Sequence, residues 1–360
     1  MPSSLNVVIA CGGTGGHLFP GIAVAEEMRR RGHTVTLLIS EKKVDAQASS
    51  KYGDLDFRTI PAIAKPATFS IKMVPFMAKM WQTIGQCKKI LKELNADAVL
   101  GMGGFTSLAP VYAAHKLGLK SFVHDSNALP GKANRLTSRW CNAVFLGLEE
   151  ASSYFPNSKV VITGTPVRSE LTKLPSRDDA AAKWKLNPEL KTILVMGGSQ
   201  GAKQLNTVVA TTASAMPDVQ FLHLTGNRDF DRVNELAAAH PNHHVVSFCD
   251  DMPSAYAASD LTICRSGASS LSEISYLEMA SILVPYPYAA DDHQTKNAEV
   301  FADAGAALLR QEADLDSGSL LADLTQILFE SNQLAEMAEK SASIAIKDAA
   351  SQICGAIESA

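Results

Sequence analysis

The sequence has little net charge and few cysteines. Its formal net charge is −4 at pH 7, which argues against nucleic acid as the main partner, because nucleic acids bind strongly basic surfaces. The six cysteines include no CxxC pair, so their spacing favours neither zinc binding nor a disulfide framework. We expect reduced thiols in a cytosolic protein.

Long apolar runs and common nucleotide motifs are also missing. No run approaches the roughly 18 apolar residues of a membrane span, and the first residues lack a secretory signal pattern. We therefore expect a cytoplasmic protein, or one attached to a membrane only from its surface. Leu18 stands where GxGxxG needs its third glycine, and there is no GKS or GKT, so neither NAD nor ATP use is predicted.

The length of the chain and a recurring order of strand, glycine-rich stretch and helix predict two α/β domains. A chain of 360 residues exceeds the roughly 250 to 300 residues that one hydrophobic core usually serves. Residues 7–10 form a predicted strand, residues 11–17 a glycine-rich stretch, and a helix follows with Pro20 in its first turn and Gly32 at its end. The same plan recurs from residue 191, so both domains are expected to be doubly wound, with ligands at the carboxyl ends of the strands.

The glycine-rich stretch at 11–17 lets backbone amides approach an anion or a sugar, and it places His17 beside whatever is bound. A second glycine-rich stretch, at 101–107, repeats the design. The polar residues 124–127 follow another predicted strand. They suit either a ligand or a capped turn.

Two stretches in the second half suggest a nucleotide sugar. Residues 265–273 form a strand-to-helix turn whose amides suit phosphate, and Glu273 suits either a ribose or the positive end of the helix. Gln294 suits sugar hydroxyls. Asp291, Asp292 and His293 could in principle hold a metal, but adjacent residues point in different directions, so helix capping is favoured.

Lysines alternate with apolar residues over 64–92. This pattern is typical either of an ordinary helix packed on the core or of a surface that binds an anionic membrane. The residues predicted to face the membrane are Lys72, Phe76, Met77, Lys79, Met80 and Trp81.

Seven motifs carry a resemblance to a known family. They are GGTGGHLFPG at 12–21, GMGGFTS at 101–107, HDSN at 124–127, GTPVR at 164–168, GGSQGA at 197–202, RSGASSLSE at 265–273 and DHQTKNA at 292–298. In this order they resemble the MurG family of glycosyltransferases over nearly the whole chain. The resemblance implies the GT-B architecture, in which two Rossmann-like domains face a central cleft. It implies an acceptor and membrane-binding domain at 1–164 with about 342–360, and a UDP-sugar domain at 165–341.

The resemblance also implies an activity. Members transfer N-acetylglucosamine (GlcNAc) from UDP-GlcNAc to the N-acetylmuramic acid (MurNAc) C4 hydroxyl of lipid I, with inversion, and so form lipid II for peptidoglycan synthesis. The implied place is the cytoplasmic face of the bacterial cell membrane, with an anionic membrane surface and cell-wall or division proteins as further partners. No metal or other cofactor is implied. The alternatives are a UDP-GlcNAc 2-epimerase, another GT-B UDP-sugar transferase and a non-catalytic UDP-sugar-binding subunit.

Roles carry over by motif. His17 is the best candidate for general base, because imidazole titrates near about pH 6.5, and Asp125 is the competing candidate. The chain departs from the family at Phe105, where tyrosine is common, and in HDSN, where HEQN is common. The acceptor-binding residues implied are Gly13, Gly103, Gly104 and Phe105. The donor-binding residues implied are Thr14, Gly15, Gly16, Asn127, Arg168, Ser199, Phe248, Cys249, Ala268, Ser269, Ser270, Leu271, Ser272, Glu273 and Gln294.

Overall fold

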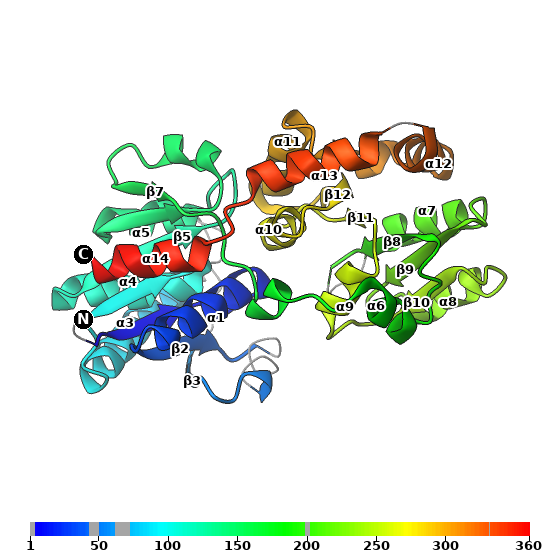
Figure 1. The fold of residues 1–360 in the computed structure, drawn as a ribbon. Helices are drawn as coiled ribbons and strands as arrows, with labels where there is room; N and C mark the ends of the chain where they lie inside the picture. The colour runs from blue at the N-terminus through cyan, green and yellow to red at the C-terminus, as the bar shows by residue number, and fades with distance from the viewer. Residues whose placement is uncertain (1–3, 43–49, 62–72, 199–201, 331) are drawn as a thin grey trace. The chain divides into compact units, whose positions relative to one another are not determined.

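The computed structural model describes residues 4–42, 50–61, 73–198, 202–330 and 332–360. It divides into two compact units. The first consists of Met1–Arg168 with Ile346–Ala360, and the second is Ser169–Ala345. Each unit contains one sheet whose described strands all pair in parallel (Figure 1).

The first sheet has seven strands in the order β3-β2-β1-β4-β5-β6-β7. Alternate residues of β1 face opposite sides, because side chains alternate along a strand. Val7 and Ile9 pack into one core cluster, and Val8 and Ala10 pack into another. The strands are β1 (Asn6–Ala10), β2 (Thr34–Ser40), β3 (Asp56–Ile60), β4 (Ala98–Gly101), β5 (Lys120–Asp125), β6 (Ala143–Leu146) and β7 (Val160–Ile162).

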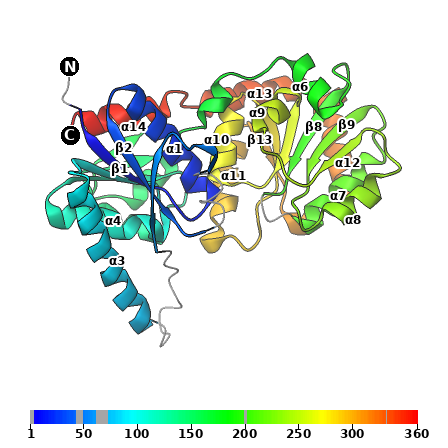
Figure 2. The ribbon, with the colours of Figure 1, turned by 90° about the horizontal axis from the view of Figure 1, so that it is seen from below.

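Helices cover both faces of this sheet, as Figure 2 shows for the first unit. The apolar residues of α1 and α14 join Val7 and Ile9, whereas those of α3 and α4 join Val8 and Ala10. The helices are α1 (Gly15–Arg30), α3 (Met73–Glu93), α4 (Gly104–Leu117), α5 (Lys132–Thr137) and α14 (Ala349–Glu358).

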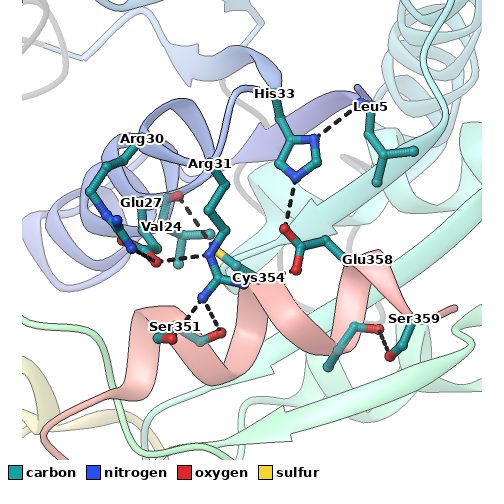
Figure 3. Close-up of polar contacts among 11 residues, drawn as sticks. Leu5, Val24, Glu27, Arg30, Arg31, His33, Ser351, Cys354, Glu358 and Ser359 are labelled. Atoms are coloured by element: carbon teal, nitrogen blue, oxygen red, sulfur yellow. Dashed lines mark hydrogen bonds and ion pairs between the residues drawn. The ribbon is translucent and has the colours of Figure 1, made fainter. Parts of the chain in front are cut away.

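Helix α14 returns to the first unit at the end of the chain and is fixed there by a cluster of polar contacts (Figure 3). The Arg31 guanidinium contacts Glu358 at 2.8 Å and donates to the Ser351 hydroxyl at 2.6 Å. His33 Nε2 lies 2.8 Å from the other carboxylate oxygen of Glu358. The hydrogen bond with His33, followed by that with Arg31, holds the pKa of Glu358 below its ordinary value.

The second sheet has six strands in the order β10-β9-β8-β11-β12-β13. Helices α7, α12 and α13 bury apolar residues in a single cluster with β8, β9, β11 and β12. A smaller apolar cluster contains residues of α6 and Ala258. The strands are β8 (Lys191–Met196), β9 (Val219–Leu224), β10 (His243–Val246), β11 (Leu261–Cys264), β12 (Ala280–Leu283) and β13 (Ala307–Leu309).

The remaining elements are helical. The α-helices of the second unit are α6 (Arg177–Trp184), α7 (Lys203–Ala213), α8 (Phe230–Ala237), α9 (Met252–Ala257), α10 (Ala268–Tyr276), α11 (His293–Asp303), α12 (Ser317–Thr325) and α13 (Gln333–Ile344). The 3-10 segments are Ser138–Trp140, Glu149–Tyr154, Ser169–Thr172, Ala290–Asp292 and Glu312–Asp314, and Gln326–Glu330 is a π-helical turn.

The doubly wound plan predicted from the sequence is confirmed in both units. The predicted start of the first helix was wrong. Helix α1 begins at Gly15, so Pro20 lies inside the helix and not in its first turn. Because proline has no backbone N–H, the carbonyl of Gly16 receives no hydrogen bond from residue 20. The glycine-rich stretch is therefore half loop and half helix, and His17 belongs to the helix.

Candidate active site

The two glycine-rich stretches of the first unit follow neighbouring strands at a topological switch point. Strands β1 and β4 pair in parallel, with Ala10 opposite Gly101. To one side of this pair the chain proceeds through β2 and β3, and to the other through β5, β6 and β7. In doubly wound sheets such a point, at the carboxyl ends of the strands, is where ligands bind.

Ser107 ties these two stretches together, a role that was not predicted. Its buried Oγ lies 3.0 Å from the carbonyl oxygen of Ala10 and 2.7 Å from that of Gly103, which share its single hydrogen, and it accepts from the N–H of Gly103 at 3.0 Å. Its place at the end of the second glycine-rich stretch was the only signal in the sequence.

The imidazole of His17 rests against the second stretch. A Cβ on Gly103 would lie 2.8 Å from His17 Cε1 and 3.0 Å from Nδ1, and a Cβ on Gly104 would lie 3.4 Å from Nε2. Both glycines also have positive φ, of +116° and +70°. The structure therefore brings His17, Gly103 and Gly104 together, and only residues without a side chain leave room for the ring.

The start of α1 offers backbone donors beside His17. Thr14 is the N-cap residue, with an extended backbone, and its side chain makes no capping hydrogen bond. The first amides of a helix have no partner within the helix and lie at its positive end, so those of Gly15 and Gly16 suit an anion or a sugar oxygen. Gly13 has φ +111°, and its carbonyl accepts a hydrogen bond of 2.9 Å from Lys42 Nζ.

Asp125, at the end of β5, is buried and accepts hydrogen bonds from two side chains. Its Oδ1 accepts from Asn127 Nδ2 at 3.2 Å, and its Oδ2 accepts from Asn134 Nδ2 at 2.8 Å. Asn134 was not predicted as a site residue. Its Nδ2 lies 3.2 Å from the position of a Cβ on Gly103, so it borders the turn that holds His17.

The neighbouring His124 has a structural role. It is fully buried, and its Nε2 lies 2.9 Å from the carbonyl oxygen of Gly164. Burial is the main cause that lowers its pKa. A neutral ring that links β5 to the loop after β7 is consistent with these contacts.

The structure places two further predicted residues of the first unit. The guanidinium of Arg168 lies 4.9 Å from the ring centroid of Phe19 on α1. This cation–π contact sets the arginine near the start of α1. The ring of Phe105 packs edge-on against Phe76 of α3, with centroids 6.3 Å apart.

The second unit has its own switch point, between β8 and β11. Cys264 pairs with Met196, so the loops after these strands leave the same edge of the sheet. Gly267 caps α10, and the amides of Ala268, Ser269 and Ser270 occupy its first turn. Ser199, which follows β8 in the sequence, lies outside the described residues.

The turn before α10 and the start of α11 lie side by side. The Ser266 hydroxyl donates to the carbonyl of Gln294 at 2.8 Å, and Asn297 Nδ2 donates to the carbonyl of Ser266 at 3.1 Å. Gln294 Oε1 accepts from the N–H of Tyr286 at 2.9 Å, which fixes the orientation of the amide. The structure thus joins two stretches that the sequence only placed in the same half of the chain.

Glu273 lies on α10 and is 7% exposed. Its Oε2 accepts a hydrogen bond of 3.0 Å from the hydroxyl of Tyr256 on α9. Leu271 on the same helix is buried, whereas Ser272 is half-buried and donates to the carbonyl of Ala268 at 2.9 Å. Tyr256 was not predicted to have a role, because nothing in the sequence connects it to Glu273.

Phe248 and Cys249 follow β10. Phe248 is 62% exposed and Cys249 is half-buried. Exposure of a large aromatic side chain at the carboxyl edge of the sheet is consistent with a stacking surface.

The acidic cluster before α11 does not cap the helix with a side chain, so this part of the prediction was wrong. Asp292 occupies the N-cap position but makes no side-chain capping hydrogen bond, and its Oδ1 accepts from the Thr295 hydroxyl at 2.7 Å instead. His293 Nδ1 lies 2.8 Å from the carbonyl oxygen of Ala290. Within the described part of the chain, no group of three or more His, Cys, Asp or Glu residues could hold a metal ion.

Helix α3 corrects one part of the predicted membrane surface. Met80 is 5% exposed and packs into the core with Ile84, so its prediction as a membrane-facing residue was wrong. Met77, Lys79 and Trp81 are exposed, Phe76 is half-buried, and Lys72 lies outside the described residues. Among the helices that the structure describes, none is long and apolar enough to cross a membrane.

Comparison with known proteins identifies the family. A model of the glycosyltransferase family 28 N-terminal domain matches residues 7–146, and a model of the family 28 C-terminal domain matches residues 192–353. A curated relative from Citrifermentans bemidjiense, named "UDP-N-acetylglucosamine--N-acetylmuramyl-(pentapeptide) pyrophosphoryl-undecaprenol N-acetylglucosamine transferase", is 35% identical over 368 residues, which cover 99% of each chain.

Solved structures agree with this assignment. The crystal structure of MurG from Acinetobacter baumannii matches with a TM-score of 0.78 and 29% identity, over 99% of this chain and 100% of that one. A UDP-GlcNAc 2-epimerase from Neisseria meningitidis matches with a TM-score of 0.71 and 17% identity, over 99% and 100% of the two chains. The epimerase therefore shares the fold alone. The chain belongs to glycosyltransferase family 28 and, within it, to the MurG glycosyltransferases of the GT-B fold.

Proposed function

We propose that the chain transfers GlcNAc from UDP-GlcNAc to the MurNAc C4 hydroxyl of lipid I and forms lipid II with inversion. The family relationship over 99% of the chain supports the transfer itself. The observation that carries the chemistry is the His17 imidazole, seated on the turn at Gly103 and Gly104 at the switch point of the first sheet.

In this proposal His17 is the general base. An inverting single displacement needs a group that takes the proton from the acceptor hydroxyl as it attacks the anomeric carbon. His17 supplies an imidazole beside the backbone donors of Gly15 and Gly16, which suit the sugar and the acceptor. Gly13 and Phe105 are proposed to bind the acceptor as well, because Gly13 precedes the N-cap residue of α1 and Phe105 follows Gly104 in the sequence.

The second unit is proposed to hold UDP. The first turn of α10 and Ser199 suit the diphosphate, and Glu273 suits the ribose hydroxyls because Tyr256 already orients its carboxylate. The backbone near Phe248 and Cys249 suits the uracil, and Gln294 suits the sugar. Arg168 and the amides of α10 would stabilise the departing diphosphate without a metal ion.

The first unit is proposed to hold lipid I and to bind the membrane from the cytoplasmic face. Helix α3 presents Val74, Met77 and Trp81 with exposures of 75%, 44% and 58%, and the exposed Lys79 lies between Met77 and Trp81. An apolar surface beside basic residues suits an anionic bilayer. Cell-wall or division proteins are proposed as further partners at this membrane.

The test is incubation with labelled UDP-GlcNAc and a water-soluble lipid I analogue, followed by identification of the product by mass and NMR. We expect a β-linked disaccharide and free UDP. A parallel incubation without acceptor must leave UDP-GlcNAc unchanged, because epimerisation there would identify the enzyme as a 2-epimerase.

A base variant tests the role of His17. Because general-base catalysis contributes about 10²- to 10⁴-fold, His17→Ala should lower kcat at least 100-fold and leave the Kd for UDP-GlcNAc nearly unchanged. His115→Ala is the matched control, since His115 is exposed on α4 of the same unit. Full turnover by His17→Ala would exclude His17 as the base.

A further inference from the structure

The carboxylate of Asp125 is surrounded by hydrogen-bond donors. Oδ1 accepts from the backbone N–H of Asn127 at 3.0 Å and from its Nδ2 at 3.2 Å. Oδ2 accepts from the N–H of Gly131 at 2.9 Å and from Asn134 Nδ2 at 2.8 Å. The residue is 3% exposed, so these contacts replace water as its partners.

Four donors fill the acceptor capacity of an ionised carboxylate, which has about four lone-pair sites. A general base needs a lone pair directed at the hydroxyl from which it takes a proton. These contacts are those of a carboxylate that holds its neighbours in place.

We propose that Asp125 is a positioning residue for Asn127 and not a general base. This inference rests on the proposed function, in which Asn127 binds the transferred sugar. Because Asn127 Nδ2 donates to Asp125, the orientation of the amide is fixed and its Oδ1 takes the opposite direction.

The second oxygen of Asp125 extends this arrangement toward the base. Asn134 is 3% exposed, and its Nδ2 also donates to the carbonyl of His124 at 3.0 Å. Its Oδ1 is buried and has no hydrogen-bond partner among the residues that the structure describes. Asn134 Nδ2 and His17 Nδ1 both lie near the position that a Cβ on Gly103 would take, at 3.2 Å and 3.0 Å from it. One carboxylate thus contacts both the residue proposed to bind the sugar and a residue beside the proposed base.

A double-mutant cycle of Asp125→Asn and Asn127→Ala tests the inference. The Kd for UDP-GlcNAc is measured by calorimetry, which needs no lipid acceptor, and kcat is measured against pH. We expect Asp125→Asn to raise the Kd and KM for UDP-GlcNAc about tenfold, the scale of one lost charge-assisted hydrogen bond. The pH at which kcat falls on the acid side should not move. In the Asn127→Ala background, Asp125→Asn should change the Kd less than twofold.

The control is Asp97→Asn. Asp97 accepts a backbone N–H from Asn6 at 2.8 Å at the opposite edge of the same sheet, so its replacement should leave the Kd unchanged. If Asp125→Asn fails to fold, Asn134→Ala removes a single donor and leaves the carboxylate, and a Kd raised severalfold is expected.

Two results would overturn the inference. The first is a 100-fold or greater fall in turnover with an unchanged Kd and no acid limb in the pH profile, which would make Asp125 the base. The second is independence of the two sites, in which the fold-changes in Kd caused by Asp125→Asn and Asn127→Ala multiply in the double variant. An unchanged Kd in Asn134→Ala would also count against the inference. Failure of the proposed function would look different, because the wild-type chain would then bind UDP-GlcNAc without forming the disaccharide.

Discussion

The hydroxyl of Tyr256 and the carboxylate of Glu273 form a buried hydrogen bond of 3.0 Å between α9 and α10. Tyr256→Phe removes the hydroxyl and keeps the ring. A hydrogen bond to a charged group contributes about 1.5 to 3 kcal/mol. Without it the Glu273 carboxylate would be less well oriented, and part of this energy would be lost from the binding of the ribose. We expect the KM for UDP-GlcNAc to rise about tenfold with little change in kcat, as steady-state kinetics would show.

Tyr154→Phe serves as the control for this variant. Tyr154 is 41% exposed and lies in the first unit, so the loss of its hydroxyl should not alter the KM for UDP-GlcNAc. Equal KM values for Tyr256→Phe and the wild-type chain would show that Glu273 does not bind the ribose through this orientation.

Gly103→Ala should displace the base. The new Cβ would meet His17 Cε1 at 2.8 Å, and φ of +116° adds backbone strain. We expect kcat to fall at least tenfold while the Kd for UDP-GlcNAc stays the same. Gly118→Ala separates the two causes, because Gly118 has φ +73° but no described atom lies within 4 Å of the new Cβ. A similar fall in kcat in Gly103→Ala and Gly118→Ala would show that backbone strain, and not the contact with His17, causes the loss.

A buried histidine pair makes the second unit sensitive to acid. His223 Nδ1 lies 3.0 Å from His243 Nε2, and burial lowers the pKa of His223 to about 3 and that of His243 to about 4. Unfolded histidine titrates near about 6.5. The unfolded chain therefore binds protons first as the pH falls, so the stabilisation is complete above pH 6.5 and decreases from there toward pH 4.

Urea unfolding at pH 7 and pH 5 measures this effect. The fluorescence of Trp184 reports on the second unit in a variant with phenylalanine at the other two tryptophans. Each histidine should contribute up to about 1.4 kcal/mol per pH unit to the loss of stability. A variant with both histidines replaced by glutamine should show a flatter dependence on pH, even if it is less stable overall. An unchanged slope would contradict the prediction.

Neighbouring residues of α3 should respond differently to the same substitution. Trp81→Ser removes an exposed aromatic side chain and should weaken binding to anionic vesicles at least severalfold, with unfolding unaffected. Met80→Ser changes a side chain that is 5% exposed, and it should lower the free energy of unfolding by about 2 to 5 kcal/mol, as truncation in a core does. Vesicle co-sedimentation and thermal unfolding distinguish the two. Equal vesicle binding by Trp81→Ser would show that this face of α3 does not contact the membrane.

The sequence predicted the strands and glycine-rich stretches well, because short apolar runs followed by glycines have few other structures available. It predicted α1 less well. Pro20 was placed in the first turn, but packing of Leu18 and Ile22 against the sheet supports a helix that begins at Gly15 and includes the proline. Strands β3, β6 and β13 were not predicted. Strand β3 buries only one of its five residues, Ile60, and β6 and β13 are runs of only four and three residues.

Contacts within the candidate site were less predictable than its position. The order of strands and loops in the sequence predicted that the loops at one edge of each sheet lie close together. It could not show that Ser107 bridges two of them or that Tyr256 orients Glu273. Such contacts depend on how helices rotate about their axes. The same limit explains Met80 and Trp81, since adjacent helical residues differ by about 100° in direction and the lysine pattern did not fix the buried face.

The return of α14 to the first unit has a consequence for folding order. Ile353 and Ile357 belong to the core that contains β1 and α1, and the Arg31–Glu358 contact joins residues 327 positions apart. The second unit is continuous in sequence, so it can complete its core as soon as it is synthesised. The first unit, although it begins earlier, must wait for residues that emerge after all of the second, and until then the surface that receives α14 is open to solvent or to chaperones.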